Sequence, residues 1–129
     1  MGLDMFLTVR KKDNPFFDWD NDVEDVYFRK LNWIRNWLVK HLSLNEDECA
    51  EDVLVPKEKL EELLSDVRAV LNNHNLAKQL LPTKSGFFFG GTDYSDYYFD
   101  SLIGIETEIQ ALLATTDFET EDVYYDESW

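Results

Sequence analysis

Three segments of the sequence place apolar residues three or four positions apart, the spacing that lines one face of an α-helix. The first spans residues 22–42, where Asn21 and Glu24 have the pattern of a capping box. The second covers residues 56–72 and starts at Pro56, a favoured first helical residue. The third covers residues 93–113, after a cap at Thr92 or Asp93. The spacing therefore predicts three main helices. One further helical turn is expected at 76–81.

Two shorter segments have strand patterns. Residues 3, 5, 7 and 9 are apolar and alternate with Asp4, Thr8 and Arg10, and the turn signal at 13–15 ends the pattern. Residues 53–55 are a second strand candidate, which we expect to pair with the first. Together these patterns predict an α+β fold that is mostly helical, with a small two- or three-stranded sheet. Residues 1–114 are expected to form one compact domain, and residues 115–129, where the periodicity ends, a loose acidic C-terminal tail.

The charge of the chain is strongly acidic and unevenly distributed. The formal net charge is −15 at pH 7, and Lys84 is the last basic residue. The 45 residues after Lys84 hold eleven acids and eleven aromatic residues, so −11 of the charge lies there and −4 before it. A field of one sign repels phosphate and attracts cationic surfaces, with a reach of about 8 Å at physiological salt.

This charge predicts a basic protein partner and argues against direct binding to nucleic acid or to anionic membranes. No window holds 18 consecutive apolar residues, and the first residues lack the basic region of a signal peptide. Cys49 is the only cysteine, so no intrachain disulfide can form, which favours a reducing compartment. We therefore expect a cytoplasmic protein. Its oligomeric state does not follow from the sequence.

No motif for catalysis or metal binding is complete. Residues 18, 20 and 22 are aspartates with the spacing of the first calcium ligands of an EF-hand, but Val23 and Arg29 occupy the positions that need Gly and Glu. Cys49 and the two histidines lack the paired spacing of a zinc site. The glycines at 86, 90 and 91 lack the Lys and Ser/Thr of a phosphate-binding loop. The sequence thus predicts no cofactor and no metal, and favours binding over catalysis.

The remaining candidate is a protein-binding surface. At 100° per residue, Asp93, Asp96 and Asp100 lie opposite the apolar stripe of the third helix. Carboxylates one turn apart satisfy Arg and Lys side chains much as phosphates do. The predicted partner-binding residues are Asp93, Asp96, Asp100, Phe88, Glu119, Glu121 and Asp122. The alternative is a solvated aspartate face, with the tyrosines at 94, 97 and 98 in the core.

Three stretches carry a family resemblance. They are M-G-L-D-M-F-L at the start, Arg29-Lys30-Leu31-Asn32 followed by Trp37-Leu38-Val39, and L-L-P-T-K-S-G-F-F-F-G-G-T-D-Y at 80–94. Together they resemble a family of small proteins encoded by phages and prophages, chiefly of Gram-positive bacteria. Where that family often has a histidine two residues before the Trp37 position, this chain has Arg35. The resemblance implies a phage accessory protein in the bacterial cytoplasm and assigns neither a reaction nor a site.

Small acidic phage accessory proteins often block host machinery, including CRISPR nucleases. We therefore expect a non-catalytic inhibitor or adaptor that binds the basic, nucleic-acid-binding surface of a host protein, as an anti-CRISPR DNA mimic does. Two alternatives stay open. One is a small enzyme with a pocket at the Gly/Phe turn, residues 85–94. The other is a phage assembly protein that self-associates through exposed aromatic side chains.

Overall fold

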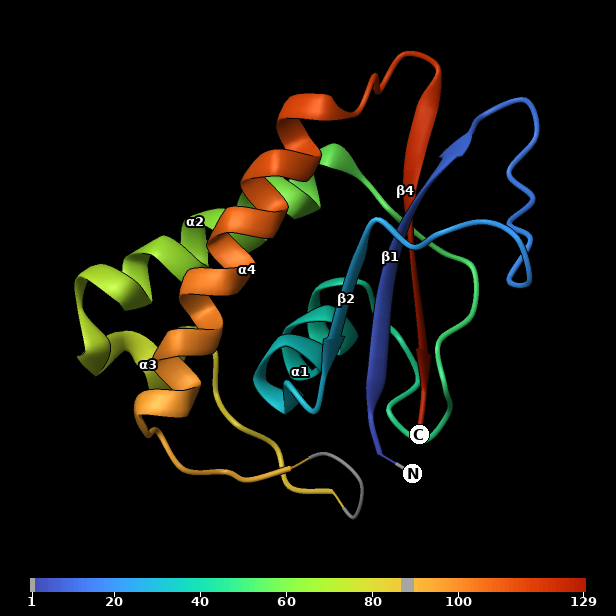
Figure 1. The fold of residues 1–129 in the computed structure, drawn as a ribbon. Coiled ribbons are helices and arrows are strands. Elements are labelled where there is room, and N and C mark those ends of the chain that lie inside the picture. Colours follow the sequence, from blue (N-terminus) through green and yellow to red (C-terminus); the bar gives the residue numbers. More distant parts are fainter. Residues whose placement is uncertain (1, 87–89) are drawn as a thin grey trace.

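The computed structural model describes residues 2–86 and 90–129, which form a sheet with helices on one of its faces (Figure 1). The strands are β1 (Asp4–Lys11), β2 (Val26–Arg29), β3 (Val53–Val55) and β4 (Glu121–Ser128), all antiparallel in the order β2-β1-β4-β3. The helices are α1 (Asn32–His41), α2 (Lys57–Asn72), α3 (Ala77–Leu80) and α4 (Asp96–Thr115), with a 3-10 turn, η1, at His74–Leu76. None of the helices within the described ranges combines the length and apolar character needed to cross a bilayer.

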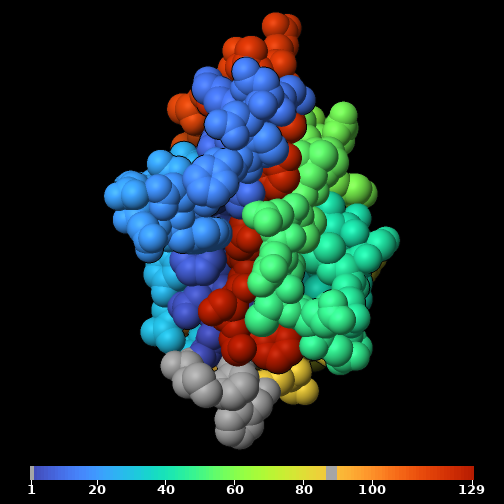
Figure 2. Space-filling model, turned by 90° about the vertical axis from the view of Figure 1, so that its right-hand side faces the viewer, coloured from blue at the N-terminus to red at the C-terminus, as the bar shows by residue number. Residues whose placement is uncertain are grey.

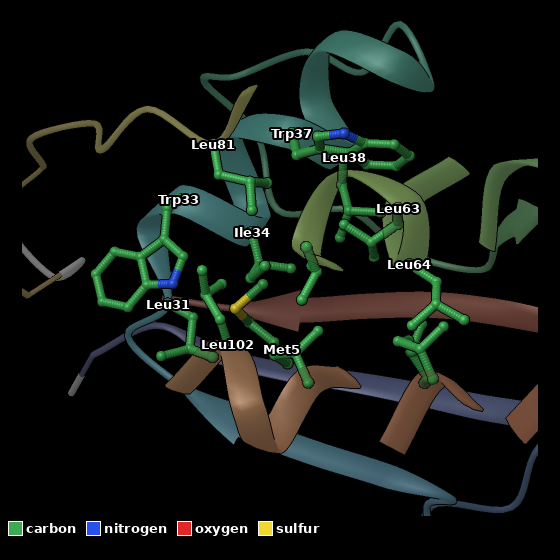
Figure 3. Close-up of a cluster of buried hydrophobic side chains, with 14 of the residues drawn as sticks. Met5, Leu31, Trp33, Ile34, Trp37, Leu38, Leu63, Leu64, Leu81 and Leu102 are labelled. Carbon is green, nitrogen blue, oxygen red and sulfur yellow. The ribbon is translucent and has the colours of Figure 1, made fainter. Parts of the chain in front are cut away.

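The core lies between the sheet and the helices. β1 and β4 pair along eight residues, with Leu7 opposite Tyr125, and both side chains are buried on the helix side. Met5 extends from β1 toward Ile34 of α1 and Leu102 of α4 (Figure 3). These side chains are 0% exposed, so the apolar faces of three elements are removed from water together.

The fold is α+β, but the predicted three helices with a two- or three-stranded sheet are wrong. Within the described residues the structure has four α-helices and a four-stranded sheet. Two strands, β2 and β4, are missing from the prediction, and β4 lies in the segment expected to be an acidic tail. It sits between β1 and β3 because Val123 and Tyr125 fill the core. Its last acids, Asp126 and Glu127, are buried in ion pairs.

The predicted first helix, residues 22–42, is also corrected. Its first part forms β2, in which Phe28 pairs with Met5, and Val23 is 81% exposed rather than in an apolar stripe. Lys30 then adopts a positive φ of 58°, which ends the strand, and α1 begins at Asn32. Backbone pairing with β1 outweighs the local helical spacing, because β1 would otherwise present an unpaired edge.

The other elements are close to their predicted ranges. α2 follows Pro56 and ends at Asn72, as predicted, and η1 with α3 supplies the extra turn. α4 starts at Asp96 after Ser95, slightly later than the caps predicted at Thr92 or Asp93. β3 exists where it was expected, but it pairs with β4 and not with β1, because β4 occupies the position between them.

Candidate binding surface

In the part of the chain that the structure describes, one face of the sheet is not covered by helices. Side chains alternate along each strand, so the residues of β1 and β4 that do not enter the core point to this open face, among them Phe6, Arg10, Tyr124 and Asp126. The loops 12–25 and 42–52 border the face on its two sides, with β1 and β4 visible between them (Figure 2). Two acidic loops therefore frame an accessible strip of sheet.

Arg10 is buried on this open face and organises its centre. Its guanidinium contacts Asp126 at 2.8 Å and Asp52 at 2.7 Å, and its Nε donates to Thr8 at 3.0 Å. The group also lies 4.5 Å from the centroid of the Tyr124 ring, a cation–π distance. Only 6% of Arg10 and 7% of Asp126 are exposed, and burial raises the pKa of the Asp126 carboxyl. Arg10 and Asp126 therefore form an interior ion pair within the sheet. The contact of Arg10 with Asp52 joins the 42–52 loop to that pair.

A second buried ion pair fixes the same loop from the other side of the sheet. The Nε of Arg35 lies 3.0 Å from both carboxylate oxygens of Glu127, which also accepts from the Tyr125 hydroxyl at 2.6 Å. Arg35 donates in addition to the backbone carbonyls of Glu46 and Glu48, at 3.0 and 3.3 Å. Arg35 thus has a structural use, because it anchors the backbone of the acidic loop.

A cleft of about 390 Å³ opens on the sheet face between the two loops. It is lined by Phe6, Trp19, Glu51, Asp52, Asp126, Glu127 and Ser128. The rings of Phe6 and Trp19 meet edge to face at 5.4 Å, and Trp19 is 47% exposed. Glu51 is exposed at the rim and forms no ion pair with any described residue. Aromatic walls beside carboxylates suit a cationic group such as a guanidinium.

The two loops that border the open face are rich in acidic side chains, of which Glu51 and Asp52 line the cleft itself. The acids are Asp13, Asp18, Asp20, Asp22, Glu24 and Asp25 from one loop, and Glu46, Asp47, Glu48, Glu51 and Asp52 from the other. The nearby bases Lys11 and Lys12 are paired with Glu121 and Asp122, at 3.6 and 2.9 Å. A hydrogen bond from the Asn21 amide holds the pKa of Asp18 below its ordinary value. The field over the cleft is therefore negative.

The predicted partner-binding residues do not form one surface. Asp93, Asp96 and Asp100 are exposed at the start of α4, where they make no ion pair with the described residues. The other predicted acids, Glu119, Glu121 and Asp122, lie beyond its far end; Glu119 is exposed, and the last two are paired with lysines. A helix of 20 residues is roughly 30 Å long, so the two groups are separate. Phe88 lies outside the described residues.

The described part of the Gly/Phe turn packs against the β2–α1 connection. The buried Asn32 side chain donates to the Gly91 carbonyl at 2.8 Å and accepts from the Lys84 amide at 2.9 Å. Gly90 has a φ of 86°, and a Cβ there would lie 3.1 Å from Lys30. Residues 84 and 91, on the two sides of the turn, are thus tied to Asn32 by hydrogen bonds that shape the loop.

The tyrosines of the same region divide between core and surface. Tyr98 is fully buried and donates to the Leu81 carbonyl at 2.7 Å, whereas Tyr97 is 61% exposed and Tyr94 is half-buried. The interpretation as core residues therefore holds for Tyr98 and in part for Tyr94, which packs against the core, and is wrong for Tyr97. Among residues 2–86 and 90–129, no three His, Cys, Asp or Glu side chains are grouped in a way that would hold a metal ion.

Sequence reasoning missed the cleft because its residues come from four distant segments. The available signal was Arg10, a charged residue inside a strand pattern, which needs a partner when it is buried. Its partner Asp126 lies 116 positions away. Comparisons with protein-family models, with curated proteins and with solved structures found no match.

Proposed function

We propose that this chain is a phage-encoded accessory protein of the bacterial cytoplasm, a non-catalytic inhibitor or adaptor that binds a basic, nucleic-acid-binding surface of a host protein. The observation that supports this function is the cleft on the open sheet face, with aromatic walls and two acidic loops around it. A defence nuclease is one class of host protein with such a basic surface.

The chemistry of the open face matches that of a phosphate-binding surface. Arg and Lys side chains that bind phosphates in pairs of hydrogen bonds accept carboxylates in the same geometry. Trp19 and Phe6 offer ring faces and edges to a guanidinium, as nucleic-acid bases do. The chain already holds one guanidinium in this way, since Arg10 lies between carboxylates and the Tyr124 ring.

The aspartates of α4 supply a second acidic site in this proposal. Asp93, Asp96 and Asp100 are exposed and form no ion pair with the described residues, so they remain available to cations. Because the open sheet face and the start of α4 lie on different elements, substitutions at one site leave the other intact. The two sites are therefore separable by experiment.

The test compares three double charge reversals that each change the net charge by the same amount. Asp20→Lys with Glu51→Lys alters the cleft, and Asp96→Lys with Asp100→Lys alters α4. The matched control is Glu58→Lys with Glu61→Lys, at exposed positions of α2. A partner is captured from infected host cells at low and high salt, identified by mass spectrometry, and titrated with each purified variant.

We expect binding that weakens steeply with salt, a loss of at least tenfold for the cleft variant, and a smaller loss for the control. A further loss for the α4 variant would add that helix to the interface. Equal effects of all three variants would show that net charge alone attracts the partner, and the cleft would then have no specific role. Binding that does not respond to salt would contradict the proposal.

A further inference from the structure

A second groove lies between the edge strand β2 and α4, two elements that are labelled in Figure 1. Its volume is about 390 Å³, and most of its lining is apolar, with Phe28, Leu31, Tyr97, Gly104 and Ile105 among the lining residues. It shares no lining residue with the acidic cleft. The groove is therefore a separate site of different character.

An exposed aromatic side chain borders this groove. Tyr97 lines it and is 61% exposed. Tyr27 of β2 also lines it, although its ring stacks on Phe6 at 5.2 Å and its hydroxyl donates to Asp4 at 2.6 Å on the open face of the sheet. A mostly apolar groove with an exposed aromatic side chain at its edge suits an interaction site.

The backbone of β2 has hydrogen-bonding groups to offer at the same place. Within residues 2–86 and 90–129, β2 is an edge strand that pairs with β1 alone. The Lys30 N–H donates to the Leu3 carbonyl. Because hydrogen-bonded pairs alternate along an antiparallel ladder, the backbone N–H and C=O groups of Phe28 also point toward β1. The N–H and C=O groups of Tyr27 and Arg29 consequently point away from the sheet. An unpaired edge of this kind is a template for an added strand.

Gly104 keeps the groove open. It lies in the middle of α4, where glycine is among the least favourable residues, and a Cβ at this position would have no atom within 4 Å. The internal packing of the chain therefore does not require glycine here. The missing side chain leaves room for another chain to approach α4 closely.

We propose that an extended segment of a basic partner protein adds to β2 as a fifth strand. Its backbone pairs with Tyr27 and Arg29, and its apolar side chains, at alternate positions, enter the groove beside Gly104. The side chains at the positions between point to the open face of the sheet, where Asp4 neutralises Arg29 at 2.9 Å and the bordering loop 12–25 is acidic, so basic residues are favoured there. A second copy of the chain is the disfavoured occupant, because each copy carries a net charge of −15.

The probe is the acetylated and amidated peptide Lys-Val-Lys-Ile-Lys-Val-Lys, titrated into ¹⁵N-labelled protein at 0.15 M salt. We expect amide shifts along β2 and the facing side of α4, and slower hydrogen exchange at Tyr27 and Arg29. The control peptide has proline in place of the two lysines beside isoleucine and one extra lysine at each end to keep the charge. It lacks the two backbone donors that would face β2 in antiparallel pairing, so we expect it to bind at least tenfold more weakly. Shifts confined to the acidic cleft around Trp19, or equal binding of the proline peptide, would overturn strand addition.

The matching protein variant is Gly104→Leu, which fills the groove and replaces a poor helix former by a good one. We expect a higher unfolding temperature together with at least tenfold weaker peptide binding. Ala111→Leu, at an exposed position of the same helix, is the control and should bind the peptide normally. Unchanged binding by Gly104→Leu would exclude the groove as the site. If the unmodified protein sediments as a dimer and Gly104→Leu sediments as a monomer, the occupant of the groove is a second copy of the chain and not a basic partner.

Discussion

Replacement of Arg10 by methionine tests whether the open sheet face is held by an interior ion pair. Methionine keeps much of the length of the side chain and removes its charge, which leaves Asp126 ionised and 7% exposed with no cation beside it. Asp52, the other partner, has a side chain that is 68% exposed, so water can solvate it after the change. The loss of stability is therefore expected to come mainly from Asp126.

The expected magnitude follows from that burial. Removal of one partner of a buried ion pair costs about 3–5 kcal/mol, whereas an exposed pair contributes about 0–1 kcal/mol. For a domain of this size, roughly 3–5 °C of unfolding temperature corresponds to each kcal/mol. We expect Arg10→Met to unfold roughly 10–25 °C below the unmodified protein.

Urea unfolding followed by tryptophan fluorescence measures the free energy of unfolding. The double variant Arg10→Met with Asp126→Asn removes the stranded charge but keeps the oxygen that accepts from the Asp52 amide at 2.8 Å. We expect it to recover at least half of the loss. A loss below about 1 kcal/mol for Arg10→Met, or a double variant no more stable than the single one, would refute an interior role for this pair.

Three further outcomes are expected. Burial raises the pKa of Asp126 above its ordinary value of 3.8, so the folded state binds this proton more tightly than the unfolded state. In urea titrations at successive pH values, the unmodified protein should therefore gain stability relative to Asp126→Asn as the pH falls from 7 through the raised pKa toward 3.8. Tyr98→Phe leaves the Leu81 carbonyl without its donor and should cost about 1–2 kcal/mol in the same assay. Asn32→Ala releases the loop around Lys84, and trypsin should cleave there faster than in the unmodified chain.

Sequence patterns predicted the elements whose cores are local. α2 and α4 have apolar residues at helical spacing, and those side chains, such as Val67 and Ile109, are buried as the spacing requires. The first strand was predicted from alternation, and Leu3 and Met5 are 0% exposed. The aspartates at 96 and 100 are exposed on α4, which the same periodicity predicted.

Sequence patterns failed where the partners of a residue lie far along the chain. β4 resembled a solvated tail because it ends in Asp126 and Glu127, and acids at such positions are usually exposed. Their cations, Arg10 and Arg35, are 116 and 92 positions away. β2 resembled the start of a helix because its pairing with β1 leaves no trace in local spacing. The cleft was missed for the same reason, since it is formed by segments that meet only in the folded chain.

The central position of β4 has a consequence for how the chain reaches its native state. β1 obtains its principal neighbour only when residues 121–128 exist, since Lys11 pairs with Glu121 and Asp4 with Ser128. Closing so long a loop is slow, and folds dominated by such pairings form in milliseconds to seconds, well after helices such as α2 and α4. During synthesis at about 5–20 residues per second, β1 waits roughly 5–20 s for this strand. Its apolar side chains, Leu3, Met5 and Leu7, therefore spend that time without the sheet that later buries them.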